Sequence, residues 1–149
     1  MNFFFDTNIL LHYIKKSALA AKVEGTYRPF APENLSIISI VTEGELKSIA
    51  VQNNWGDKKI KVLEELLKQF LTIPIDSHNV TDKYAEVDAY SQGRLSSRPL
   101  PPEMSSRNMG KNDLWIAASA SITSSTLLTT DGDFDHLNGI YFPVVKLQV

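Results

Sequence analysis

Short apolar runs alternate with helix-forming segments along almost the whole chain. The segments between the runs carry apolar residues at helical spacing, as Ile9, Leu10 and Tyr13 do near the start. Strands joined through helices run parallel, and a parallel sheet is covered by helices on both faces. We therefore expect an α/β fold of three layers, α/β/α, with a central mostly parallel sheet of about five strands. The predicted strands are residues 2–6, 35–39, 71–75, 126–130 and one near 140–147, and the predicted helices are residues 7–16, 17–25, 41–53, 57–70, 78–92 and 113–123.

Bulk composition is that of one globular domain spanning residues 1–149. The chain is 43% hydrophobic and 21% charged, as in ordinary soluble proteins. It contains no cysteine, which excludes disulfides and thiolate metal sites and fits a reducing compartment. No apolar run is long enough to span a membrane, and the N-terminus has no signal-peptide pattern. We therefore expect a cytoplasmic protein without a membrane partner.

Four carboxylates follow buried strands or lie just inside predicted helices, at widely separated points of the chain. They are Asp6 in FFFDTN, Glu45 in SIVTEGEL, Asp113 in GKNDLWIAASA and Asp131 in LLTTDGDF. In an open α/β sheet, ligands bind outside the carboxyl ends of the strands. Carboxylates suit Mg²⁺ or Mn²⁺, and these ions suit phosphoryl-ester chemistry. The pattern predicts one site in which these acids are both the metal ligands and the catalytic residues.

Net charge leaves the partner of such a site open. The formal charge is −2, with 15 basic and 17 acidic residues, which argues against a general nucleic-acid coat. If the four acids hold cations, however, 13 acidic residues remain against 15 basic ones, and the rest of the surface is mildly basic.

Three of these acids also have an ordinary structural explanation. Asp6 can cap the helix that follows it, which is compatible with metal binding because a cap uses one carboxylate oxygen. Asp113 can be an acid favoured by the helix dipole, with Asn112 as the cap, but this does not explain why it faces inward. Asp131 and Gly132 form an ordinary turn pair.

Some candidate acids have acidic neighbours in the sequence, and the position of each side chain decides which acid is the better candidate. On a helix that turns about 100° per residue, Glu45 lies about 40° from Ile49 on the packed side, and Glu43 lies about 120° from it toward solvent. A carboxylate beside packed residues needs a partner or a metal, so we predict Glu45. Asp133 is the reserve candidate, and Asp135 is expected on the surface. The histidines show no metal-ligand spacing and are predicted to be surface or hydrogen-bonded residues.

Other polar residues supply candidates for supporting and binding roles. Thr7 and Asn8 offer a hydroxyl and an amide beside Asp6. The loop 94–111 is rich in serine and proline, carries an excess of positive charge and leads into Asp113. A solvated loop is the ordinary meaning of such a stretch, but its basic residues are also candidates for binding phosphates beside the metal: Arg94, Arg98, Arg107 and Lys111.

Four stretches, in this order, resemble the PIN domain and most closely the VapC-type toxins of bacterial toxin–antitoxin pairs. They are FFFDTNILLHYI, ISIVTEGELKS, NMGKNDLWIAASA and LLTTDGDFDHL. The resemblance implies a parallel sheet flanked by helices and a Mg²⁺- or Mn²⁺-dependent endoribonuclease. It carries Asp6, Glu45, Asp113 and Asp131 over as the acidic constellation.

The same resemblance implies supporting residues and partners. Thr7, Asn8 and Thr130 would be supporting polar groups. Proteins of this kind often form homodimers, are held inactive by a small antitoxin protein and act on RNA. The basic loop 94–111 is not a fixed feature of the family, so its role does not follow from the resemblance.

Two other functions are consistent with parts of the pattern. One is a haloacid-dehalogenase-like phosphatase with Asp6 as nucleophile, although this chain has Asn8 where that family usually has a second aspartate. The other is a catalytically silent PIN-like module that binds RNA or a partner protein.

Overall fold

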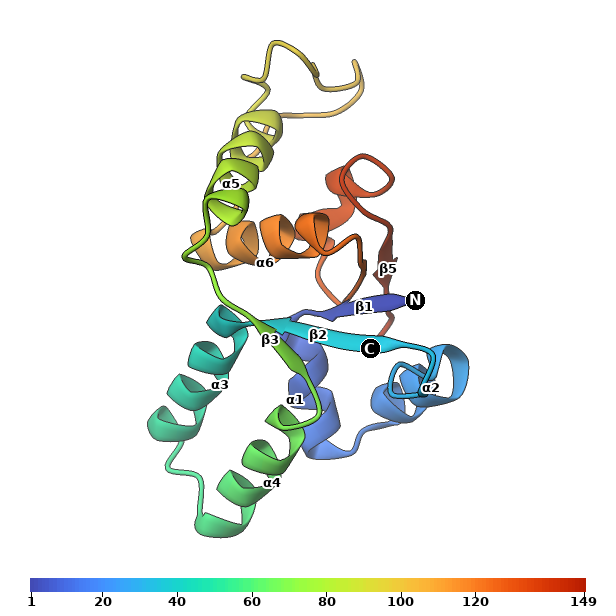
Figure 1. The fold of residues 1–149 in the computed structure, drawn as a ribbon, viewed down its shortest axis with the longest axis vertical. Helices are drawn as coiled ribbons and strands as arrows, with labels where there is room; N and C mark the ends of the chain where they lie inside the picture. Colours follow the sequence, from blue (N-terminus) through green and yellow to red (C-terminus); the bar gives the residue numbers. More distant parts are fainter.

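Five parallel strands form one sheet at the centre of the molecule. The computed structural model describes all residues from 1 to 149 (Figure 1). The strand order is β3-β2-β1-β4-β5, and each neighbouring pair is parallel, which confirms the predicted fold class. The strands are β1 (Asn2–Phe5), β2 (Leu35–Ser39), β3 (Leu71–Ile73), β4 (Thr126–Thr129) and β5 (Val144–Lys146).

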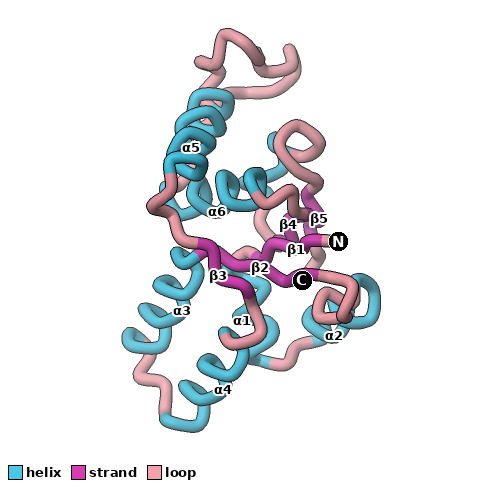
Figure 2. The backbone as a smooth tube through the Cα atoms, viewed as in Figure 1, coloured by secondary structure: helices cyan, strands magenta, loops and turns pink.

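Helices cover both faces of the sheet, in two groups that Figure 2 shows on opposite sides of the strands. The first four helices pack on one face and the last two, with a 3₁₀ helix, on the other. None of the helices is long and apolar enough to cross a bilayer. The helices are α1 (Thr7–Lys15), α2 (Ala18–Tyr27), α3 (Ile40–Gln52), α4 (Asp57–Leu67), α5 (His78–Ser91), α6 (Lys111–Ile122) and the 3₁₀ helix η1 (Gly132–Leu137).

The phenylalanines of β1 supply both cores. Successive side chains of a strand point to opposite faces. Phe3 and Phe5 therefore join the core under α1–α4, whereas Phe4 joins the core under α5, α6 and η1. All three are at most 2% exposed. The unbroken apolar run is what a central parallel strand requires.

The parallel arrangement brings the ends of β1 and β4 together at one edge. Phe5 pairs with Leu128 in the register, and the backbone N–H of Asp6 donates to the carbonyl of Leu128 at 3.0 Å. The residues that follow each strand therefore emerge side by side, Asp6 after β1 and Asp131 two residues after the end of β4.

Several predicted boundaries were wrong by a few residues. Helix α6 begins at Lys111, and its N-cap is Gly110, so Asn112 is not the cap. Likewise Gly56, and not Asp57, is the N-cap of α4.

The two edge strands also differ from the prediction. Strand β3 ends at Ile73, just before Pro74, which cannot donate a ladder hydrogen bond. The last strand covers only Val144–Lys146, because the segment before it forms η1 and turns. Between α5 and α6 the chain has no helix or strand, as predicted for the basic loop.

Candidate functional site

Asp6 lies almost fully buried at the junction of β1 and α1. It is 4% exposed and is the N-cap of α1. Its Oδ1 accepts from the Thr7 backbone N–H at 2.8 Å, and its Oδ2 accepts from the Thr129 hydroxyl at 2.7 Å. Burial raises the pKa of Asp6 to about 6, against these two hydrogen bonds, and the charges of Asp131 and Glu45 raise it further. Each oxygen keeps a free lone pair, so capping leaves Asp6 able to face a cation.

Glu45 points from α3 toward the start of α1. The Thr7 hydroxyl donates to Glu45 Oε1 at 2.7 Å and lies 3.0 Å from the hydroxyl of Thr42. Glu43, by contrast, forms an ion pair with Lys47 at 3.6 Å. Of the two acids, Glu45 therefore belongs to the hydrogen-bond network around Asp6.

Three further carboxylates form a group of the size that one ion requires. Asp113, Asp131 and Asp133 each offer one oxygen, and the three oxygens lie within 4.8 Å of one another. Asp131 Oδ1 also accepts from the backbone N–H of Asp133 at 2.9 Å, which begins η1. Two oxygens bound to one Mg²⁺ lie at most about 4.2 Å apart, since each Mg–O distance is ~2.1 Å. Small side-chain rotations therefore close the group onto a divalent ion.

The five acids form one electrostatic cluster at the carboxyl ends of β1 and β4. Burial raises the pKa of Asp113 to about 7, and the charges of Asp6, Asp131, Asp133 and Glu45 raise it further. The donor set contains only oxygen, which suits Mg²⁺ or Mn²⁺ better than softer metals. From the sequence, Asp133 was the second choice after Asp131 for this site. The structure groups Asp133 directly with Asp113 and Asp131, because η1 turns the chain back toward α6.

The hydroxyl that hydrogen-bonds to Asp6 from the end of β4 is that of Thr129, the neighbour of the predicted Thr130. Thr129 is fully buried, donates to Asp6 and accepts from the backbone N–H of Asp131 at 2.9 Å. Thr130 forms no side-chain hydrogen bond, and the exposed Asn8 forms none either. Residues two apart share a face of a strand, so the spacing between Thr129 and Asp131 was the signal available in the sequence. No spacing of this kind in the sequence indicated Thr42, whose hydroxyl lies 3.0 Å from that of Thr7.

Sequence and structure comparisons assign the family. The family model of the PIN domain matches residues 3–140. The chain belongs to the PIN-domain family. The VapBC2 complex from Rickettsia felis, bound to a DNA fragment from its promoter, is 21% identical to this PIN domain with a TM-score of 0.73 and 98% of each chain covered. VapBC-1 from nontypeable Haemophilus influenzae is 20% identical with a TM-score of 0.72, again over 98% of each chain. No curated protein matches the chain. At these identities the two solved structures share the fold.

The basic residues of this PIN domain divide into separate places. Arg94 and Arg107 line a small polar cavity beside the end of α5. The Arg98 guanidinium instead lies 5.0 Å from the centre of the Tyr141 ring, and Lys111 is exposed at the first residue of α6. None of the four forms an ion pair with an acid. Two of the four predicted phosphate-binding residues therefore share one cavity.

A buried histidine in the PIN domain lies outside the ion-sized group of carboxylates. His136 is 3% exposed, and its Nε2 lies 2.7 Å from the hydroxyl of Ser91. Burial lowers the pKa of His136 to about 4, and the positive charge of Arg107 lowers it further. Its Nδ1 has no partner. The sequence predicted that each histidine is either exposed or hydrogen-bonded. His136 is hydrogen-bonded, but only through Nε2.

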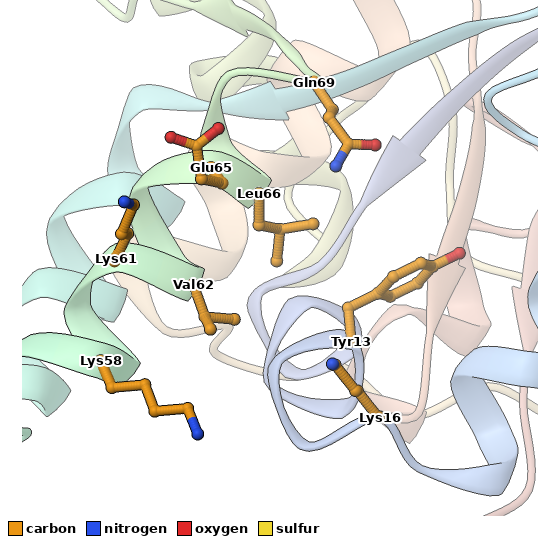
Figure 3. A pocket seen from close by; sticks show the side chains of 8 residues that line it. All are labelled: Tyr13, Lys16, Lys58, Lys61, Val62, Glu65, Leu66 and Gln69. Carbon is orange, nitrogen blue, oxygen red and sulfur yellow. The ribbon is translucent and has the colours of Figure 1, made fainter.

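A groove between α1 and α4 lies apart from the acids. It has a volume of about 470 Å³. Figure 3 shows Val62 and Leu66 of α4 facing the groove opposite Tyr13 of α1. None of the five clustered acids lines it, so it takes no part in holding an ion at the acid cluster. Its lining residues are Tyr13, Lys16, Lys58, Lys61, Val62, Glu65, Leu66 and Gln69.

Proposed function

We propose that this PIN domain is a Mg²⁺- or Mn²⁺-dependent endoribonuclease that hydrolyses RNA phosphodiester bonds. The observation that carries the proposal is the gathering of Asp6, Glu45, Asp113, Asp131 and Asp133 at one edge of the sheet. Carboxylates held this close repel one another, at ~4 kcal/mol for a pair of charges 4 Å apart at an effective dielectric of about 20. A bound divalent cation would relieve this repulsion.

The residues would divide the work as follows. Asp113, Asp131 and Asp133 would hold the ion, with Asp6 and Glu45 completing its surroundings. A divalent ion bound there supplies an activated water and neutralises charge on the phosphate. Thr129 orients the Asp6 carboxylate, and Thr7 orients that of Glu45, through hydrogen bonds of 2.7 Å each. These bonds fix the acids before an ion arrives, which lowers the cost of ordering them.

We further propose that the chain is the toxin of a toxin–antitoxin pair. Structures from VapBC systems share its fold over 98% of both chains, and such a system supplies a second protein. The partner would be a small antitoxin protein that masks the acids, and the toxin would form a homodimer and act in the cytoplasm. Copurification of the chain with the product of an adjacent gene tests the pairing.

The structure disfavours the phosphatase alternative. A nucleophilic aspartate must be open enough for its carboxylate to reach the phosphorus of the substrate. Asp6 is 4% exposed and both of its oxygens accept hydrogen bonds from the protein. Asp6 is better suited to holding a charge in place than to attacking a phosphate.

RNA cleavage by matched variants tests the nuclease. We expect the wild type to cleave structured RNA with Mn²⁺, and Asp113→Asn to lose at least about a hundredfold in rate, because a carboxylate beside the ion is removed. Asp135→Asn is the control, since Asp135 pairs with Lys146 on the surface and lies outside the ion-sized group. Equal rates in Asp113→Asn and wild type would remove the acids from the reaction. RNA binding without cleavage by the wild type would instead favour the silent PIN-like module.

A further inference from the structure

A small polar cavity lies where the basic loop leaves α5. Its volume is about 210 Å³, and no hydrophobic residue lines it. The lining contains two guanidinium groups, two amides and one hydroxyl, which are hydrogen-bond donors suited to an anion. The residues are Gln92, Arg94, Ser106, Arg107 and Asn108.

The backbone fixes both arginines at the end of α5. The N–H of Arg94 donates to the carbonyl of Ala89, and the N–H of Arg107 donates to the carbonyl of Ser91, each at 2.8 Å. The buried Met109 anchors the loop below the cavity, because the Ser91 hydroxyl donates to its sulfur at 3.4 Å. Arg94 and Arg107 are 13 positions apart in the sequence, and both are therefore held against the last turn of α5. The cavity is a built feature of the fold.

No acid neutralises the two guanidinium groups. The nearest acids along the chain are Asp88, which accepts from the Gln92 amide at 2.9 Å, and Glu103 in the loop. Neither forms an ion pair with Arg94 or Arg107. Two arginines that line one cavity without a counter-charge favour an anion that accepts several hydrogen bonds.

We infer that this cavity binds a backbone phosphate of the RNA strand, away from the bond that is cut; this inference rests on the proposed nuclease function. Asn108 precedes Asp113 by five residues, so their Cα atoms lie at most about 18 Å apart. A nucleic-acid strand covers that distance in about five nucleotides at ~3.4 Å per phosphate along a helix. A strand held by the cavity can therefore reach the acid cluster within about five nucleotides.

Direct binding measurements without metal test the cavity separately from cleavage. The probe is a fluorescein-labelled single-stranded RNA of about 12 nucleotides, a length that single-strand binding surfaces cover. With EDTA present, we expect the Arg94→Gln, Arg107→Gln double variant to bind it at least about tenfold more weakly than wild type. The slope of log K against log salt should become shallower by about 0.7 for each phosphate charge no longer neutralised. Arg28→Gln, at the end of α2 on the other face of the sheet, is the matched control and should bind as wild type does.

Each outcome decides one point. Equal affinity and equal salt slope in the double variant and the wild type would overturn the inference. Loss of calorimetric binding of inorganic phosphate in the double variant, with unchanged RNA affinity, would assign the cavity to a free anion and overturn the RNA assignment. The structured RNA of the cleavage assay, incubated with wild type and Mn²⁺, tests the nuclease separately. Absent cleavage with a persisting affinity difference refutes only the nuclease, and cleavage with equal affinities refutes only the cavity.

Discussion

Asp6 and Asp113 make the stability of the metal-free protein depend on pH. Their pKa values are raised from 3.8 to about 6 and about 7, so the folded state binds these protons more tightly than the unfolded state. Their stabilising contribution is complete below pH 3.8 and is lost as pH rises through 6 and 7. The lowered pKa of His136 acts in the opposite direction, since its contribution is lost as pH falls from 6.5 toward about 4. Matched variants are needed to separate the two.

We expect Asp6→Asn to flatten the loss of unfolding free energy between pH 4 and pH 7 relative to wild type, because it removes one of the two shifted carboxyl groups. Urea titrations in EDTA at several pH values measure this. Asp82→Asn, an exposed acid of α5 without an ion pair, should keep the wild-type profile. Parallel profiles for Asp6→Asn and wild type would mean that the raised pKa of Asp6 is not linked to folding.

A single buried hydroxyl orients two of the clustered acids. Thr129 donates to Asp6 and accepts from the backbone of Asp131. Thr129→Val keeps the shape of the side chain and removes both bonds, so Mn²⁺ should bind roughly 10–100-fold more weakly. Thr129→Ser retains the hydroxyl and should bind nearly as wild type does. Isothermal titration with MnCl₂ measures the affinities, and wild-type affinity in the valine variant would contradict a positioning role for Thr129.

At the scale of elements, a buried hydrogen-bonded pair joins η1 to α5, beside the apolar core that the two elements share. Ser91 and His136 lie 45 residues apart, and their side chains meet at 2.7 Å. Ser91→Ala leaves His136 Nε2 without a partner in a buried position, which should lower the free energy of unfolding by about 1–3 kcal/mol. Ser97→Ala, in the exposed loop, should change it by less than about 0.5 kcal/mol. Urea midpoints at constant slope measure both. Equal midpoints would show that the pair does not hold η1 in place.

Elements with strong periodicity were predictable, and the irregular ones were not. The parallel sheet followed from apolar runs separated by helical segments, because only a few topologies bury such runs on both faces. The start of α6 was placed two residues late, since Gly110 caps it without the side-chain signal that Asn112 offered. Asp133 is ranked below Asp131 from the sequence because Asp131 is nearer the strand end. The turn of η1 that brings Asp133 into the group has no repeating pattern to predict it. The cavity between Arg94 and Arg107 depends on how a loop folds back, which local sequence does not encode.

For the whole molecule, a bound divalent ion should raise the melting temperature. A ligand at a concentration 100 times its Kd stabilises the folded state by about 2.7 kcal/mol. For a domain of this size each kcal/mol shifts the midpoint by about 2–4 °C, so saturating Mn²⁺ should raise it by roughly 5–10 °C. Thermal scans with and without MnCl₂ measure the shift, and Asp113→Asn should largely abolish it. An unchanged midpoint in the wild type at saturating Mn²⁺ would contradict the metal site.

The hydrogen bond between Thr129 and Asp6 joins residues 123 positions apart. A ribosome that makes this chain N-terminus first therefore releases Asp6 long before the residues that complete its surroundings. Until Thr129, Asp131 and Asp133 have been translated, the nascent polypeptide lacks the full set of acids. The order in which residues are added therefore completes the acid cluster, and with it the proposed metal site, only near the end of synthesis.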